Sequence, residues 1–345
     1  AAASPTPPKA DAAPVSSASI LVDADTGRVL LEQNAHTPLP PGSLTKTLTA
    51  MIAADWLPPG SSVPVTPDAF NAYPDKVGMK PGQQWPLAIT LHALITDSAN
   101  DAAYALAIKI GGSLQGFPAV MQDAGRQIGL ADHPVLEDPA GLDGSEGVNG
   151  GNRISVWDLA IMGRDMMANP QLATIAGQRT FDFEGPDGIA YHIVSRNWHF
   201  LASYPGAIGV KTGFTNAAGY CSMEEAEKGG RHMLAVVLHS TNPDLVAATL
   251  MDKGFSTPVA AESTLPLLPE VREPSPAPPP PPPTTAAPTE AAKVAPVPPT
   301  HRHTPNRTGW LDVLGAAGIV AGIGVWTRRW VKARQPVPAE VESRR

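Results

Sequence analysis

The prolines of this chain constrain its fold more than any other feature of the sequence. There are 39 among 345 residues, and they crowd the first fifteen residues and the stretch from about Leu265 to Pro305. Because proline has no backbone N–H and a fixed φ, neither stretch can supply hydrogen-bonded helix or sheet to a core. The stretch between them, about 240 residues, is long enough for one sizeable core.

This distribution predicts the domain organisation. We expect residues 1–16 to be a disordered arm left after removal of a signal peptide, because the chain opens on small residues without a methionine. Residues 17–263 would form a single globular domain. Residues 264–306 would form a linker, in which six consecutive prolines favour the extended polyproline II conformation. A proline-rich ligand for a partner protein is the alternative interpretation of that stretch.

An apolar segment follows the linker. Residues 310–326 carry one charge, Asp312, and have tryptophan at both ends, with a pair of arginines just beyond. This arrangement is typical of a single membrane span. We expect residues 307–330 to be a transmembrane anchor in contact with membrane lipid, and the basic residues 331–345 to be a cytoplasmic tail. The globular domain would then be exported and lie outside the membrane. A helix in the membrane interface is the alternative, although the segment lacks the charged face of such helices.

Composition excludes several functional classes. A net charge of −7 and the absence of a basic patch in the globular part argue against a nucleic-acid partner. The one cysteine, Cys221, excludes an intrachain disulfide, and its apolar neighbours indicate a buried, unreactive thiol. The nine histidines show no metal-ligand spacing, so we expect neither a metal ion nor a cofactor.

The hydrophobic pattern predicts an α+β fold. Two apolar runs flank an Asp-Thr-Gly turn near the start of the domain and predict a β-hairpin. Apolar residues at helical spacing predict helices at 43–56, 90–110, 117–128, 155–167 and 244–253. Further strands are predicted at 191–194, 207–211, 219–225 and 232–239. Strands at both sequence ends with helices between them indicate an antiparallel sheet flanked by helices, with an additional helical region.

The first chemically suggestive pattern is Ser43-Leu44-Thr45-Lys46. It places a hydroxyl and an amine one helical turn apart, near a predicted helix N-terminus. A serine needs a base to become a nucleophile, and lysine can be that base only if burial or a nearby cation lowers its pKa. By itself the pattern is weak, because a helix cap beside a surface lysine looks the same.

Two further groups strengthen this hypothesis. Ser98-Ala99-Asn100 lies where the predicted helix 90–110 should break, because Asp and Ser compete for backbone hydrogen bonds. Its serine could relay a proton and its amide could hold a peptide. Lys211-Thr212-Gly213 ends a predicted strand, where a cation and a hydroxyl could bind a carboxylate. Ser195-Arg196-Asn197 also fits S-x-N, but it follows a strand and is interpreted as a structural turn.

In order, spacing and flanking residues, these motifs resemble the serine D,D-carboxypeptidases among the low-molecular-mass penicillin-binding proteins. The resemblance extends over about Ser17 to Phe255, and also includes Gly141-Leu142-Asp143. It implies a β-lactamase/D,D-peptidase-like fold and a substrate peptide of the bacterial wall that ends in D-alanyl-D-alanine. It also implies acylation by β-lactam antibiotics, which mimic that substrate.

The resemblance implies a role for each motif residue. Ser43 would form the acyl-enzyme, Lys46 would be the base, and Ser98 would complete the proton network. Asn100, Lys211, Thr212 and Gly213 would bind substrate, and the backbone N–H groups of Ser43 and Phe214 would form the oxyanion hole.

Three departures accompany the resemblance. Many relatives supply a carboxylate-binding arginine at about Leu238–Leu245, whereas this chain has none between Arg231 and Arg272. Ala99 stands where glycine is frequent. The proline-rich linker takes the place of a small second domain, and a membrane span that of an amphipathic anchor.

Three alternative functions remain open. A D,D-endopeptidase would use the same catalytic set. A class A β-lactamase would need a glutamate to activate water, and neither Glu137 nor Glu146 has the expected setting. A non-catalytic penicillin-binding module would not need Ser43 and Lys46 intact.

Overall fold

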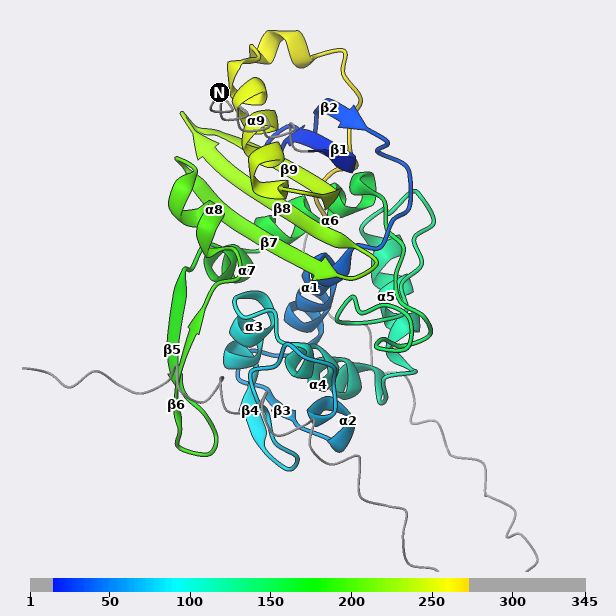
Figure 1. Ribbon diagram of the computed structural model, residues 1–345, viewed down its shortest axis with the longest axis vertical. Coiled ribbons are helices and arrows are strands. Elements are labelled where there is room, and N and C mark those ends of the chain that lie inside the picture. Colours follow the sequence, from blue (N-terminus) through cyan, green and yellow to red (C-terminus); the bar gives the residue numbers. More distant parts are fainter. Residues whose placement is uncertain (1–14, 273–345) are drawn as a thin grey trace, which may run out of the picture. The chain divides into compact units, whose positions relative to one another are not determined.

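The computed structural model describes residues 15–272, except for the side chain of Glu262. Its centre is a five-stranded antiparallel sheet with the strand order β2-β1-β9-β8-β7 (Figure 1). These strands are β1 (Ser16–Asp23), β2 (Val29–Gln33), β7 (Ala207–Thr215), β8 (Gly219–Lys228) and β9 (Arg231–Ser240). The sheet therefore joins the two ends of the domain, as the sequence predicts.

Helices cover both faces of the sheet. On one face α9 packs on β1, β8 and β9, and α8 contacts β7; on the other, α6 packs on the same three strands as α9 (Figure 1). The three helices are α6 (Val156–Ala168), α8 (Trp198–Ser203) and α9 (Pro243–Ser256). Alternation along β1 divides its side chains between these layers, because Ile20 and Val22 join the larger core while Leu21 joins the core beneath α9.

A helical region forms the other half of the domain. It contains α1 (Lys46–Trp56), α2 (Pro67–Phe70), α3 (Leu87–Ile95), α4 (Asn100–Gly111), α5 (Phe117–Gln127) and α7 (Pro170–Ala176). Short 3-10 turns are η1 (Gly42–Thr45) and η2 (Val259–Glu262). The described residues also contain two antiparallel two-stranded sheets: β3 (Ser62–Pro64) with β4 (Gln84–Pro86), and β5 (Thr180–Glu184) with β6 (Ala190–Val194). The α+β prediction is confirmed.

Two local outcomes bear on function. The predicted helix 90–110 breaks as expected, giving α3 and α4 with Ser98 between them at φ +61°. The strand predicted at 207–211 is too short, because β7 continues to Thr215. Lys211, Thr212 and Gly213 pair with Met223, Ser222 and Cys221 of β8, so the triplet lies within the strand and not at its end.

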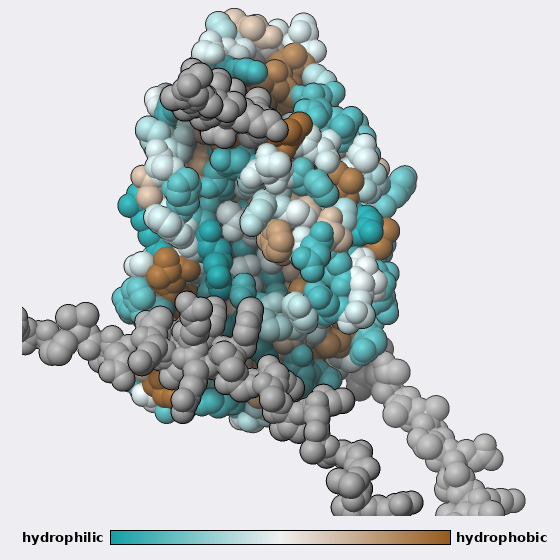
Figure 2. Space-filling model, in the orientation of Figure 1, coloured by the Kyte–Doolittle hydropathy of each residue, from teal (hydrophilic) through white to brown (hydrophobic). Residues whose placement is uncertain are grey.

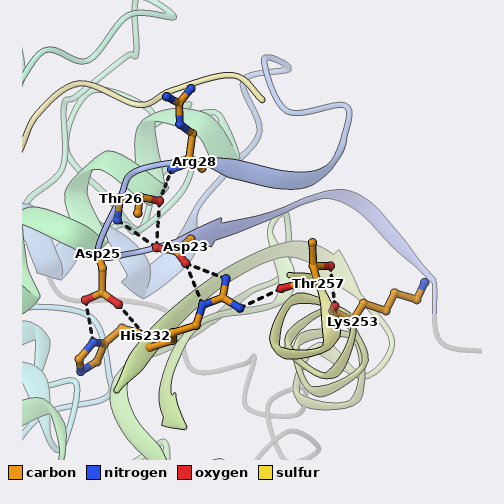
Figure 3. A network of polar contacts seen from close by, with 8 residues as sticks. Asp23, Asp25, Thr26, Arg28, His232, Lys253 and Thr257 are labelled. Atoms are coloured by element: carbon orange, nitrogen blue, oxygen red, sulfur yellow. Dashed lines mark hydrogen bonds and ion pairs between the residues drawn. The ribbon is translucent and has the colours of Figure 1, made fainter. Parts of the chain in front are cut away.

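A polar network fixes the end of the sheet formed by the β1–β2 turn and the start of β9 (Figure 3). Asp23 accepts hydrogen bonds from Thr26 and from the guanidinium of Arg231, and Asp25 contacts His232. Arg231 also donates to the carbonyl of Thr257 at the end of α9. These contacts join strands from both ends of the sequence.

The chain continues to pack on this domain after α9. Backbone hydrogen bonds join Val29 N to Pro266 O and Leu268 N to Gly27 O, and Leu268 is buried. The part of the chain that the structure describes contains no helix long and apolar enough to cross a membrane. The predicted arm ends earlier than expected, because β1 already begins at Ser16. Residues 1–14 of the arm, residues 273–306 of the predicted linker, the anchor at 307–330 and the tail at 331–345 lie outside the described residues.

Candidate active site

Ser43 and Lys46 lie at the junction of η1 and α1. The Lys46 Nζ lies 2.8 Å from the Ser43 Oγ and 2.8 Å from the carbonyl oxygen of Ala140. Lys46 is fully buried, whereas Ser43 is partly exposed and lines a cavity. The amine therefore approaches the hydroxyl from the protein interior, and the hydroxyl faces the cavity.

Burial changes the acid–base character of Lys46. Removal of the ammonium from water lowers the pKa of Lys46 from 10.5 to about 7, although the carboxylates of Asp138, Asp75 and Asp101 act in the opposite direction. Asp138 also accepts hydrogen bonds from the backbone N–H of Ala140, whose carbonyl accepts from Lys46. A lysine with a pKa near neutrality can take a proton from serine, as the sequence hypothesis required.

Ser98 and Asn100 lie across the break between α3 and α4. Ser98 lines the same cavity as Ser43. Asn100 is buried at the start of α4, where its Nδ2 donates to Tyr73 O at 2.8 Å and its Oδ1 has no hydrogen-bond partner among the described residues. Within the described residues the Asn100 amide thus serves to fix the 73–75 segment; its contact with substrate stays a prediction.

Lys211, Thr212 and Gly213 bring β7 to the cavity. Thr212 and Gly213 line it, whereas Lys211 is buried and its Nζ donates to the carbonyl of Thr212 at 2.7 Å. Burial, followed by the charges of Lys46 and Arg196, holds the pKa of Lys211 well below its usual range. Thr212 thus forms part of the cavity wall, and Lys211 lies behind that wall.

Two glycines let backbone segments approach closely at this site. A Cβ on Gly213 would lie 3.0 Å from the backbone nitrogen of Ser43 and 3.1 Å from Pro41 O. A Cβ on Gly141 would lie 1.9 Å from Gly42 O, and Gly141 has φ +80°. Glycine is therefore required where β7 and the 138–152 loop meet η1. Ser43 and Phe214, whose amides the resemblance assigns to an oxyanion hole, both line the cavity.

The cavity has a volume of about 440 Å³ and contains two features that the sequence interpretation did not assign. Arg196, placed by sequence in a structural turn, lines it together with Asp75. Asp244, in the first turn of α9, lines the region where relatives are expected to carry an arginine. The face of the described residues shown in Figure 2 is mostly hydrophilic, with hydrophobic residues in small separate patches.

The structure therefore brings together Ser43, Ser98, Thr212, Gly213 and Phe214 as cavity-lining residues, with Lys46, Asn100 and Lys211 buried behind them. Cys221 is free and buried, and burial raises the pKa of its thiol to about 11, in agreement with the prediction of an unreactive residue. Among residues 15–272, no cluster of three His, Cys, Asp or Glu side chains could hold a metal ion. A buried amine with a lowered pKa beside a serine hydroxyl is the pair of groups that nucleophilic acyl transfer needs.

Comparison with known proteins gives a consistent result. A family described as D-alanyl-D-alanine carboxypeptidase matches residues 3–242. D-alanyl-D-alanine carboxypeptidase DacB2 of Mycobacterium tuberculosis is 32% identical over 243 residues, a match that covers 69% of this chain and 81% of the relative. DacF of Bacillus subtilis is 27% identical, with 69% and 61% covered. The crystal structure of a D-alanyl-D-alanine carboxypeptidase from Mycobacterium tuberculosis aligns with a TM-score of 0.65 at 32% identity, covering 71% of this chain and 92% of that one.

Proposed function

Because the chain belongs to the D-alanyl-D-alanine carboxypeptidase family, and so to the hydrolases of the bacterial wall, we propose that it removes the terminal D-alanine from wall pentapeptides through an acyl-enzyme on Ser43. The observation that carries this mechanism is the 2.8 Å contact between the Ser43 hydroxyl and the buried amine of Lys46. β-Lactams would acylate the same oxygen.

In the acylation step, the neutral Lys46 amine takes the Ser43 proton as the Oγ attacks the carbonyl between the two D-alanines. The developing oxyanion accepts hydrogen bonds from the backbone N–H groups of Ser43 and Phe214. The C–N bond then breaks, and the proton passes to the amine of the departing D-alanine with Ser98 as relay. In the second half of the reaction, Lys46 activates the water that hydrolyses the ester.

Substrate binding rests on β7 and α4. The Thr212 hydroxyl in the cavity wall would bind the terminal carboxylate, and the Lys211 amine behind it, when protonated, would make the site electropositive. Gly213 leaves room for the peptide to lie along the strand, and Asn100 would hold the peptide backbone. The close approach of Gly213 to the Ser43 amide supports this arrangement.

Hydrolysis of a β-lactam adduct should be slow. Class A β-lactamases use a glutamate to activate the deacylating water. Among the described residues, the carboxylates that line the Ser43 cavity are those of Asp75 and Asp244, and no glutamate is among them. This supports a penicillin-sensitive peptidase over a β-lactamase.

We also propose that residues 307–330 anchor the enzyme in the cell membrane with the catalytic domain outside, on the strength of the apolar segment and the basic tail. The test compares the full chain with one that ends at residue 306, both expressed with an export signal. The full chain should stay with membranes after carbonate extraction and the shorter one should not. Equal release of both would contradict the anchor.

Release of D-alanine from a free pentapeptide, measured beside cleavage of a cross-linked dimer, tests the activity itself. A carboxypeptidase should act mainly on the pentapeptide, and Ser43→Ala should abolish turnover. Preferential cleavage of the dimer would identify an endopeptidase instead. Turnover that persists in Ser43→Ala would refute the mechanism, whereas an inactive wild type that still binds penicillin would indicate a binding module.

A further inference from the structure

The segment Ser195-Arg196-Asn197, which has no part in the proposed chemistry, contacts the turn that carries Ser98. Arg196 donates from its backbone nitrogen to Thr96 O at 2.9 Å and from Nε to Asp97 O at 3.2 Å. One of its terminal nitrogens lies 3.2 Å from a carboxylate oxygen of Asp97. One residue thus makes three contacts to the two residues immediately before Ser98.

The same guanidinium reaches the segment on the other side of the turn. It lies 3.5 Å from the carboxylate of Asp75, and Asp75 O accepts the backbone N–H of Asn100 at 2.8 Å. Tyr73 O accepts the side-chain amide of Asn100. Arg196 therefore connects both segments that bound Ser98-Ala99-Asn100, and it does so at the wall of the cavity.

Ser98 needs such support because of its backbone. Its φ of +61° lies in the left-handed region, which costs free energy for any residue with a Cβ. Such a conformation persists where surrounding contacts determine it. The contacts of Arg196 act on the residues directly before this turn.

Arg196 is itself held from the sheet. The next residue, Asn197, is buried and donates from Nδ2 to the carboxyl of Glu224 on β8 at 2.6 Å, while its backbone N–H donates to the Ser195 hydroxyl. Glu224 is fully buried. The 195–197 segment thus links the rigid sheet to the turn between α3 and α4.

We propose that Arg196 is a positioning residue for Ser98, and that it acts on the peptidase reaction by holding the Ser98 hydroxyl in the cavity. This inference rests on the proposed function. A lysine could not replace it, because a single ammonium cannot reach the Asp97 carbonyl, the Asp97 carboxylate and the Asp75 carboxylate together.

The test is a double-mutant cycle between Arg196→Gln and Ser98→Ala, with D-alanine release as the assay. A positioned proton-transfer group contributes about 10²- to 10⁴-fold to rate, so Arg196→Gln should lower kcat about 10- to 100-fold and change KM less than about threefold. In the Ser98→Ala background, Arg196→Gln should cost almost nothing more. Arg196→Lys should behave like Arg196→Gln.

Arg126→Gln is the matched control, because Arg126 is exposed and pairs with Asp123 away from the cavity; it should leave kcat unchanged. Additive losses in the cycle would overturn the proposal. So would a rise in KM at unchanged kcat, which would assign Arg196 to direct carboxylate binding. If Arg196→Gln does not fold, Arg196→Lys, verified by thermal unfolding, takes its place in the cycle.

The two proposals fail separately. Turnover in Ser43→Ala would remove the proposed function and this inference with it. An inactive Ser43→Ala beside a fully active Arg196→Gln would leave the function intact and refute only the positioning role.

Discussion

Replacing Lys46 by methionine should abolish catalysis and, at low pH, make the folded protein more stable. The fully buried Lys46 amine has its pKa lowered from 10.5 to about 7, so at pH 7 about half of the amine is neutral, against about 0.03% for an ordinary lysine. That neutral fraction makes Lys46 a usable base. The same burial destabilises the folded protein, because the amine must either be charged away from water or give up a proton that it keeps in the unfolded chain.

The sign of this cost follows from proton binding. Between pH 7 and pH 10.5 the unfolded chain keeps the Lys46 proton and the folded chain releases it, so the contribution of Lys46 to stability rises with pH across that window. Below pH 7, the difference between the two pKa values corresponds to a destabilisation of the folded protein by about 5 kcal/mol. The free energy of unfolding should regain about 2.5 kcal/mol of this between pH 6 and pH 9. Methionine has no proton to lose.

Lys46→Met also removes hydrogen bonds to Ser43 and Ala140, worth about 1 kcal/mol each, but that loss does not depend on pH. Urea unfolding of wild type and variant at pH 6 and pH 9 separates the two effects. The stability of the variant relative to wild type should be higher by about 2.5 kcal/mol at pH 6 than at pH 9. The charge of Lys46 also lowers the pKa of Lys211. Removing that charge lets folded Lys211 keep its proton more easily, which also stabilises the variant more at pH 6 than at pH 9. An equal difference at both pH values would refute a depressed Lys46 pKa, as would a wild-type acylation rate that does not rise with pH through about 7.

Two further substitutions and one labelling experiment have defined outcomes. Gly213→Ala should slow penicillin acylation at least about tenfold, because the new Cβ lies 3.0 Å from the Ser43 amide. Labelling with a fluorescent penicillin measures the acylation rate, and an unchanged rate would contradict the close-packing role of Gly213. Asp138→Ala should lower the free energy of unfolding by about 3–5 kcal/mol, because three backbone N–H groups and a tyrosine hydroxyl lose their buried acceptor. Urea unfolding measures this loss, and a loss under about 1 kcal/mol would be inconsistent with the role of Asp138 as that acceptor. Cys221 should resist a thiol reagent at pH 8 and react on unfolding, since it is buried with its pKa raised to about 11; rapid labelling of the native protein would disagree.

Features encoded within a few residues could be predicted from the sequence. The sequence spacing predicts that Ser43 and Lys46 lie one helical turn apart, and in the structure their side chains are in contact at 2.8 Å. The break before Asn100 follows from Asp and Ser, which compete with a helix for backbone hydrogen bonds. In both cases the partners are close in the chain, so local geometry decides the result.

Features that depend on distant partners could not be predicted. The strand β7 extends to Thr215 because residues 211–215 pair with β8, and the polar Lys-Thr-Gly run shows no alternation that would indicate a strand. Arg196 contacts Asp97, 99 residues away in the chain, whereas the local sequence of its segment predicts only a turn. The role of Asp138 behind Lys46 could not be predicted either, because it depends on a distant contact and a single acidic residue before Pro139 shows no pattern.

Rapid-quench mass spectrometry with a pentapeptide ending in two D-alanines tests the acyl-enzyme most directly. During turnover, a peptide adduct that lacks one D-alanine should appear on the proteolytic fragment containing Ser43 and disappear as substrate is exhausted. It should be absent from both Ser43→Ala and Lys46→Met. An adduct on another residue, or D-alanine release with no adduct at any quench time and no burst, would contradict nucleophilic catalysis by Ser43.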